Sequence, residues 1–168
     1  MEDNKIRQSS LWKGRKQLNV FRQYRFGFDP WGLVLFLLVM QPTVIWLAVP
    51  APNDVLRTES VTPVADTIAT VCQALFVACM CFLINKERGR RRFPALIVAS
   101  IVCIAVYYIG WVLYYCGTDA PWVIILLTVP PCVTFIIYTT DRKNLSAAVF
   151  AAVFAVCHTI FAVKNFMN

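Results

Sequence analysis

Five long apolar stretches dominate this sequence and leave few folds open to it. Each is close to the roughly 20 residues that an α-helix needs to cross the hydrocarbon core of a bilayer. None alternates polar and apolar residues as the strands of a membrane barrel do, and hydrocarbon demands that backbone groups pair internally. The sequence therefore predicts an all-α, polytopic membrane protein, a bundle of five transmembrane helices. The predicted helices span Trp31–Val49, Val64–Ile84, Pro94–Cys116, Pro121–Tyr138 and Leu145–Val163.

The composition excludes an ordinary water-soluble domain. Of the 168 residues, 59% are hydrophobic and 15% are charged, whereas soluble domains average about half apolar and about a quarter charged. Nearly all the charges lie between the apolar stretches rather than inside them. A disordered chain is excluded for the same reason.

Basic residues are distributed unequally between the two sides that five crossings create. All but two of the 16 Lys and Arg residues fall on the side of the N-terminus and of the loops after the second and fourth helices; the two exceptions are Arg57 and Lys164. Because basic loops stay in the cytoplasm, we expect a cytoplasmic N-terminus, an external C-terminus and a place in the cell membrane. The net charge of +7 thus needs no nucleic acid partner.

Residues 1–29 are expected to form a basic cytoplasmic segment ahead of the transmembrane domain, residues 30–168. From Ser10 to Arg25, apolar side chains lie largely on one helical arc, opposite basic ones, which is typical of an interfacial amphipathic helix. Asp29-Pro30 is a suitable start for the first spanning helix. The residues expected to contact anionic lipids are Lys13, Arg15, Lys16 and Arg22, with Arg90, Arg91 and Arg92 in the loop after the second helix.

The first and fourth helices contain prolines near their centres, Pro42 and the pair Pro130-Pro131. A proline removes a helical hydrogen bond and kinks the backbone, so we expect both helices to bend. Broken helices near the midplane often frame the substrate site of a transporter; the alternative is a kink repaired by neighbouring helices. Because Gln41-Pro42 interrupts a stretch already too long for a signal peptide, we expect the first helix to be retained.

Gln73 and His158 are the polar residues most deeply placed in the second and fifth helices. Gln73 ends a stripe that includes Asp66 and Thr70, and His158 lies on a face of small residues. Intramembrane polar residues usually face the bundle or a water-filled cavity. They could contact a ligand, or in the case of His158 relay a proton, and the alternative is hydrogen bonding between helices.

No pattern in the sequence indicates catalysis, a metal or a cofactor. One histidine without a cluster of carboxylates or cysteines does not make a coordination set. The seven cysteines lie within or at the end of apolar stretches, where cysteine acts as a small packing residue. No nucleotide-binding, zinc-protease or nucleophile motif is present. We therefore expect a protein that is not an enzyme.

Aromatic residues crowd the outer end of the third helix. They are Tyr107, Tyr108, Trp111, Tyr114 and Tyr115. Their position near the membrane surface predicts an aromatic belt at the headgroup level. A cation-binding aromatic pocket is the alternative.

A weak internal similarity relates the first two helices to the last two. The segment 41–46 resembles 130–135, and the segment 71–76 resembles 156–161. The similarity pairs Gln73 with His158 and Pro42 with Pro131. Three crossings separate the units, so the repeat would be inverted in the membrane, as in many secondary transporters.

Two functions follow from these features. The first is a small carrier or channel-like protein whose midplane site is contacted by Gln41, Gln73 and His158 and shaped by Pro42, Pro130 and Pro131. The second is a non-catalytic accessory or regulatory membrane subunit that acts through helix packing or its basic cytoplasmic face. An open cavity reaching Gln73 would favour the carrier, and a packed interior the subunit. Either is compatible with a homodimer or a partner membrane subunit.

Overall fold

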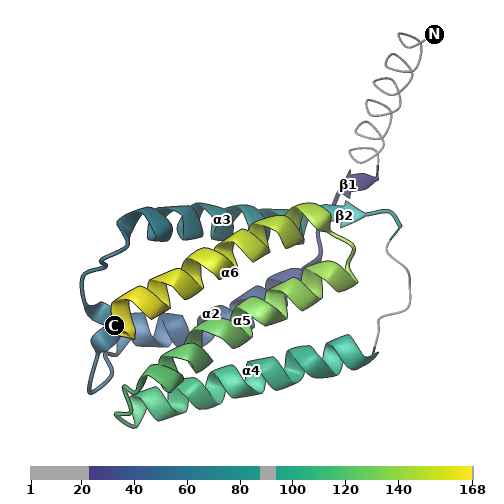
Figure 1. Ribbon diagram of the computed structural model, residues 1–168. Helices are drawn as coiled ribbons and strands as arrows, with labels where there is room; N and C mark the ends of the chain where they lie inside the picture. The colour runs from purple at the N-terminus through teal and green to yellow at the C-terminus, as the bar shows by residue number, and fades with distance from the viewer. Residues whose placement is uncertain (1–22, 88–93, 168) are drawn as a thin grey trace, which may run out of the picture.

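Five long helices make up most of the computed structural model, which describes residues 23–87 and 94–167 (Figure 1). Each is long and apolar enough to cross a membrane. The prediction of an all-α, multi-pass membrane protein with five spanning helices is confirmed to this extent. The helices are α2 (Pro30–Ala48), α3 (Pro63–Phe82), α4 (Pro94–Tyr115), α5 (Pro121–Asp141) and α6 (Leu145–Phe166).

Local sequence explains where the helices begin and end. Asp29 caps α2 by accepting a hydrogen bond from the backbone N–H of Trp31 at 3.3 Å, as expected from the Asp-Pro pair. The helices α2, α3 and α5 all start on a proline, which has no N–H to leave unpaired in the first turn. Just beyond the end of α4, Gly117 adopts the left-handed conformation, with φ of +88°, that commonly terminates helices.

The core lies where α3, α5 and α6 meet. The helix α3 packs along α6, α6 along α5, and α5 along α4. Phe76 of α3 contacts the rings of Phe135 and Phe154, with centroid distances of 4.9 and 5.4 Å. Ala147 and Ala151 of α6 are fully buried, and such small residues let helices approach closely.

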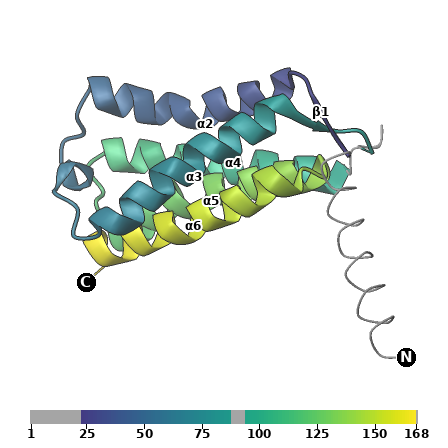
Figure 2. The ribbon, with the colours of Figure 1, turned by 90° about the horizontal axis from the view of Figure 1, so that it is seen from above.

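The helix α2 stands apart from this core. Its backbone approaches α3 and α4 at few places, and Figure 2 shows it along one side of the bundle. Long side chains rather than close backbone contact therefore connect α2 to the other helices. This arrangement leaves space between α2 and the core.

The outward faces of the bundle are apolar. In water such an extended surface would drive aggregation, whereas hydrocarbon solvates it well, so the surface fits a protein surrounded by lipid. Exposed residues of this kind include Val34 and Leu37 of α2, Val98 and Ile101 of α4, and Val149 and Val156 of α6.

Two short strands depart from the helical prediction. β1 (Tyr24–Phe26) pairs antiparallel with β2 (Leu83–Asn85), in a register that places Arg25 opposite Ile84. The prediction that an interfacial helix continues to Arg25 is therefore wrong at its end, because Tyr24 and Arg25 belong to β1. The second spanning helix stops at Phe82 rather than at the predicted Ile84. The pairing satisfies backbone groups that these short segments would otherwise leave open.

The residues expected to contact anionic lipids lie outside the described part of the chain. They are Lys13, Arg15, Lys16, Arg22, Arg90, Arg91 and Arg92. Their interaction with lipid remains a prediction.

Candidate ligand-binding cavity

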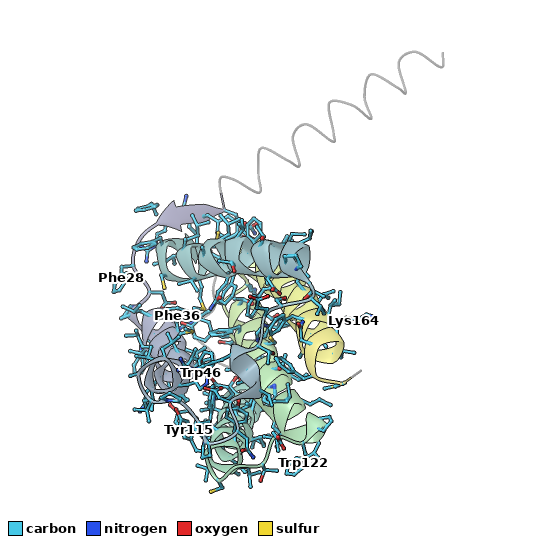
Figure 3. The ribbon with its side chains drawn as sticks, turned by 90° about the vertical axis from the view of Figure 1, so that its left-hand side faces the viewer. Phe28, Phe36, Trp46, Tyr115, Trp122 and Lys164 are labelled. Atoms are coloured by element: carbon cyan, nitrogen blue, oxygen red, sulfur yellow. The ribbon has the colours of Figure 1, made fainter. Side chains whose placement is uncertain are left out.

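A cavity of about 350 Å³ lies between α2 and the other helices. All five spanning helices contribute to its wall, and Leu56 of the short 3-10 helix η1 (Val55–Arg57) reaches it as well. Figure 3 looks at the bundle from the end that carries η1 and shows Trp46 between α2 and the remaining helices. Three of the six residues predicted to form a site line this cavity, namely Gln73, Pro131 and His158.

Gln73 brings an amide from the middle of α3 to the cavity. Its Nε2 lies 3.7 Å from the sulfur of Met40, which is a weak acceptor. Its carbonyl oxygen has no hydrogen-bond partner among residues 23–87 and 94–167. An amide can make up to four hydrogen bonds, so Gln73 retains most of its capacity for another molecule.

His158 presents an imidazole that lies between two aromatic rings. The ring stacks between Phe154 and Phe161, with centroid distances of 5.0 and 6.2 Å and interplanar angles of 17° and 5°. Neither ring nitrogen has a hydrogen-bond partner within the part of the chain that the structure describes. A neutral imidazole offers one donor and one acceptor, so both are available at the cavity.

Trp111 supplies a third polar group to the wall. Its indole Nε1 is buried and makes no hydrogen bond of good geometry in the described chain, although the hydroxyl of Tyr107 is close enough to interact with it. An unpaired buried donor costs about 1–3 kcal/mol, so it usually has a partner such as water or a ligand. The tilted ring of Trp46 lies 6.4 Å away, centroid to centroid.

The aromatic belt predicted for α4 is wrong for three of its residues. Tyr107, Trp111 and Tyr114 are only 3%, 7% and 0% exposed. They point into the bundle rather than towards the headgroups. Their spacing of four and three residues places them on one helix face. Tyr108, Trp111 and Tyr115 have an equivalent spacing, so spacing alone does not distinguish an inward face from a belt.

At Pro42, α4 brings a hydroxyl to a carbonyl of α2 that lacks its helical donor. Pro42 has no N–H for the carbonyl of Leu38, one turn earlier. The hydroxyl of Tyr108 lies 2.8 Å from that carbonyl oxygen, and Tyr107 donates to the neighbouring carbonyl of Val39 at 2.9 Å. Pro42 itself is buried but does not line the cavity. At this proline a neighbouring helix therefore replaces the lost hydrogen bond, which was the alternative to a substrate site.

Gln41 does not face the bundle interior, contrary to the prediction. Its side chain is exposed, and its Oε1 lies 2.7 Å from the hydroxyl of Tyr108. Met40 and Thr43, which share one face of α2, line the cavity instead. A helix turns about 100° per residue, so Gln41 is carried away from that face even though it adjoins Pro42.

The proline pair of α5 differs from Pro42. Pro131 is buried and lines the cavity. It has no N–H for the carbonyl of Leu127, and no side chain within residues 23–87 and 94–167 donates to that carbonyl. Pro130 is half-buried and off the wall, and its own carbonyl accepts a hydrogen bond from Thr134 at 3.0 Å.

Asp54 holds the loop that contains η1 in place at one end of the cavity. Its carboxylate accepts hydrogen bonds from Trp46 Nε1 at 2.8 Å, Tyr114 Oη at 3.0 Å and Arg57 Nε at 2.7 Å. Burial alone would raise the pKa of Asp54, but these hydrogen bonds and the charge of Arg57 outweigh it and lower the pKa below the ordinary value of 3.8. The loop is thereby held against α2 and α4, with Leu56 on the cavity wall.

At the opposite end, a buried ion pair joins α2 to α5. Arg142 Nε lies 3.6 Å from the carboxylate of Asp29, and the two side chains are only 11% and 4% exposed. The guanidinium also lies over the ring of Tyr138 at 5.1 Å. The sequence predicted Arg142 in the loop after the fourth helix, but α5 continues to Asp141 and so carries Arg142 to the start of α2. None of these residues lines the cavity.

No known protein family, curated protein or solved structure matches this chain. Nor do the described residues contain a group of three or more His, Cys, Asp or Glu side chains suited to a metal ion. The cavity itself is therefore the basis for inferring function.

The wall of the cavity is mainly apolar, with a few polar groups. Its described residues are mainly aliphatic and aromatic, and with His158 neutral none of them is charged. The polar groups are hydroxyls, an amide, an imidazole and an indole. Such walls, with a few hydrogen-bonding groups that fix orientation, are typical of small-molecule sites.

Proposed function

We propose that this protein is a small carrier of the cell membrane that binds its substrate in the cavity between α2 and the other helices. The observation that carries the proposal is that Gln73 and His158, from two different helices, reach one cavity of about 350 Å³. This volume is at the lower end of the roughly 300–1,000 Å³ of small-molecule sites. A substrate of modest size is therefore expected.

The proline pair of α5 supports the same proposal, because its surroundings differ from those of Pro42. The carbonyl freed by Pro42 is reached by a tyrosine, whereas Pro131 lies on the cavity wall with no side-chain donor for the carbonyl of Leu127. The helix α5 is continuous through Pro130 and Pro131, but a proline still removes the usual helical donor of the carbonyl four residues earlier. Transporters often coordinate substrates or ions with carbonyls freed in this way. The substrate is thus expected to contact α5 at Pro131.

The proposal includes an orientation. The N-terminus and the basic loops lie in the cytoplasm, on anionic lipids, and η1 and the C-terminus lie outside. The distribution of the 16 basic residues supports it. The cavity would then sit towards the outer face, because Leu56 of η1 and Phe166 near the C-terminus belong to its wall.

Thiol labelling tests whether the cavity admits water-borne molecules. In a cysteine-free background, Gln73→Cys and His158→Cys should both react with a small hydrophilic thiosulfonate. Asn53→Cys, in the outer loop, is the positive control. Gln41→Cys is the matched negative control, because residue 41 is exposed on the outside of the bundle, where lipid surrounds it.

Protection of positions 73 and 158, with Asn53→Cys still labelled, would contradict the carrier. That result would mean a dry interior and would favour the accessory or regulatory subunit. Labelling of positions 73 and 158 as well as 53, with position 41 protected, is the outcome that the proposal requires.

A further inference from the structure

The chemistry of the cavity wall narrows the kind of substrate, if the proposed function is correct. Charge is the first restriction. A charged ligand in this cavity would lose most of its hydration, and no described wall residue carries an opposite charge to compensate. Burying an unpaired charge is far more costly than burying a hydrogen-bonded neutral group. The ligand that this wall accepts at least cost is uncharged.

Flat rings give the second restriction. Phe154, His158 and Phe161 stack with interplanar angles of 17° and 5°, and all three line the cavity, as do Trp46 and Trp111. Because these three rings stack on one another, they turn their edges rather than their faces to the cavity. Ring edges pack against the face of a planar guest. Aromatic pairs in offset or edge-to-face geometry also gain about 0.5–1.5 kcal/mol beyond burial.

Unused hydrogen-bonding groups give the third restriction. The indole N–H of Trp111 lacks an acceptor in good geometry, since only the nearby hydroxyl of Tyr107 interacts with it. The carbonyl of Gln73 needs a donor, and the neutral imidazole of His158 has one donor and one acceptor to satisfy. These groups come from α4, α3 and α6, so a single ligand between them must offer both a donor and an acceptor. An amide or an equivalent donor–acceptor edge of a heteroaromatic ring meets that need.

We propose that the cavity binds an uncharged, planar aromatic molecule bearing an adjacent hydrogen-bond donor and acceptor, such as an aromatic carboxamide. Gln73, His158 and Trp111 hold the polar group, and the stacked rings of α6 hold the flat body. This proposal rests on the carrier function, since it concerns the same cavity.

Benzamide and its charged analogues test the charge restriction. Benzamide, benzamidine and benzoate have nearly the same shape but are neutral, cationic and anionic at pH 7. Binding to the purified full-length protein would be measured by calorimetry and by quenching of tryptophan fluorescence, since Trp46 and Trp111 lie on the wall. Benzamide should bind at least tenfold more tightly than either ion. Tighter binding of benzamidine would overturn the proposal in favour of an aromatic cation site.

Two further probes separate shape from hydrogen bonding. Cyclohexanecarboxamide keeps the amide but loses the flat ring, and toluene keeps the ring but loses the amide. Both should bind more weakly than benzamide. Equal binding of toluene and benzamide would show that the polar groups play no part and would contradict the proposal.

Substitutions then assign the contacts. His158→Phe keeps a stacking ring without nitrogens, and Gln73→Met keeps the shape of the side chain without the amide. Each should weaken benzamide about 3- to 10-fold, the value of one hydrogen bond, while Gln41→Met leaves it unchanged. Elution as a single species and an unfolding temperature near that of the unmodified protein would verify that each variant folds. The two substitutions are on separate helices, so if one variant fails to fold, the other still tests the proposal.

The labelling experiment separates a failure of the carrier function from a failure of the ligand class. If positions 73 and 158 react with the thiosulfonate but benzamide binds no better than its charged analogues, the carrier survives and the ligand class is wrong. If positions 73 and 158 are protected, both fail.

Discussion

Asp54 shows how one carboxylate can organise a whole loop. Its three hydrogen bonds and the charge of Arg57 lower its pKa, so folding is coupled to its ionised form. A group whose pKa is lower in the folded state stabilises that state fully above its unfolded pKa, near 3.8. The stabilisation is lost as the pH falls through the still lower folded value. At neutral pH the full effect is present.

We therefore expect Asp54→Asn to destabilise the protein at pH 7. The amide cannot accept all the hydrogen bonds of the carboxylate or pair with Arg57, and the cost is about 1–3 kcal/mol. Thermal unfolding of the purified protein in detergent would measure it, and the difference from the unmodified protein should shrink below pH 4. Glu59→Gln, at an exposed position in the same loop, is the control. Equal unfolding temperatures for Asp54→Asn and the unmodified protein at pH 7 would disprove the role of Asp54.

At the scale of the helix, one of the hydrogen bonds that join α2 to α4 reaches a carbonyl that a proline leaves without its helical donor. Pro42 leaves the carbonyl of Leu38 without its helical donor, and the hydroxyl of Tyr108 lies 2.8 Å from it. Pro42→Ala should restore the backbone hydrogen bond. The hydrogen bond from Tyr108 would then contribute less to the stability of the protein.

A double-mutant cycle tests this coupling between helices. Tyr108→Phe should cost about 1 kcal/mol of stability in the unmodified protein and clearly less in the Pro42→Ala background. Tyr107→Phe is the matched control, because its acceptor, the carbonyl of Val39, is not the one that Pro42 deprives. Unfolding free energies from denaturant titrations would supply the cycle. Strict additivity of Tyr108→Phe and Pro42→Ala would show that the two sites are independent.

At the scale of the whole molecule, the orientation in the membrane determines which compartment the cavity faces. The proposal places the N-terminus and Gly89 in the cytoplasm and Asn53 and Asn168 outside. A reporter active only in the cytoplasm should work when fused at residues 1 or 89, and one active only outside should work at residues 53 or 168. A cytoplasmic signal from residue 168 would be incompatible with five crossings.

Two elements of the molecule depend on contacts distant in sequence. β1 and β2 are separated by the whole of α2 and α3, and Arg142 meets Asp29 from the far end of α5. Gly110 allows α4 and α5 to approach, since a Cβ there would lie 2.9 Å from Cβ of Leu126. Such contacts depend on how the helices are arranged, which local composition does not specify.

What the sequence alone determined were the five spanning helices, the starts of α4 and α5 at Pro94 and Pro121, and Gln73 and His158 as polar residues inside the bundle. These are local consequences of hydropathy, of the missing N–H of proline and of the cost of exposing polar groups to lipid. Only the tertiary structure decided which face of each helix is covered. Helices that are apolar on every side give little amphipathic signal. For that reason Gln41 was expected to face inward, and the inward face of α4 was taken for an aromatic belt.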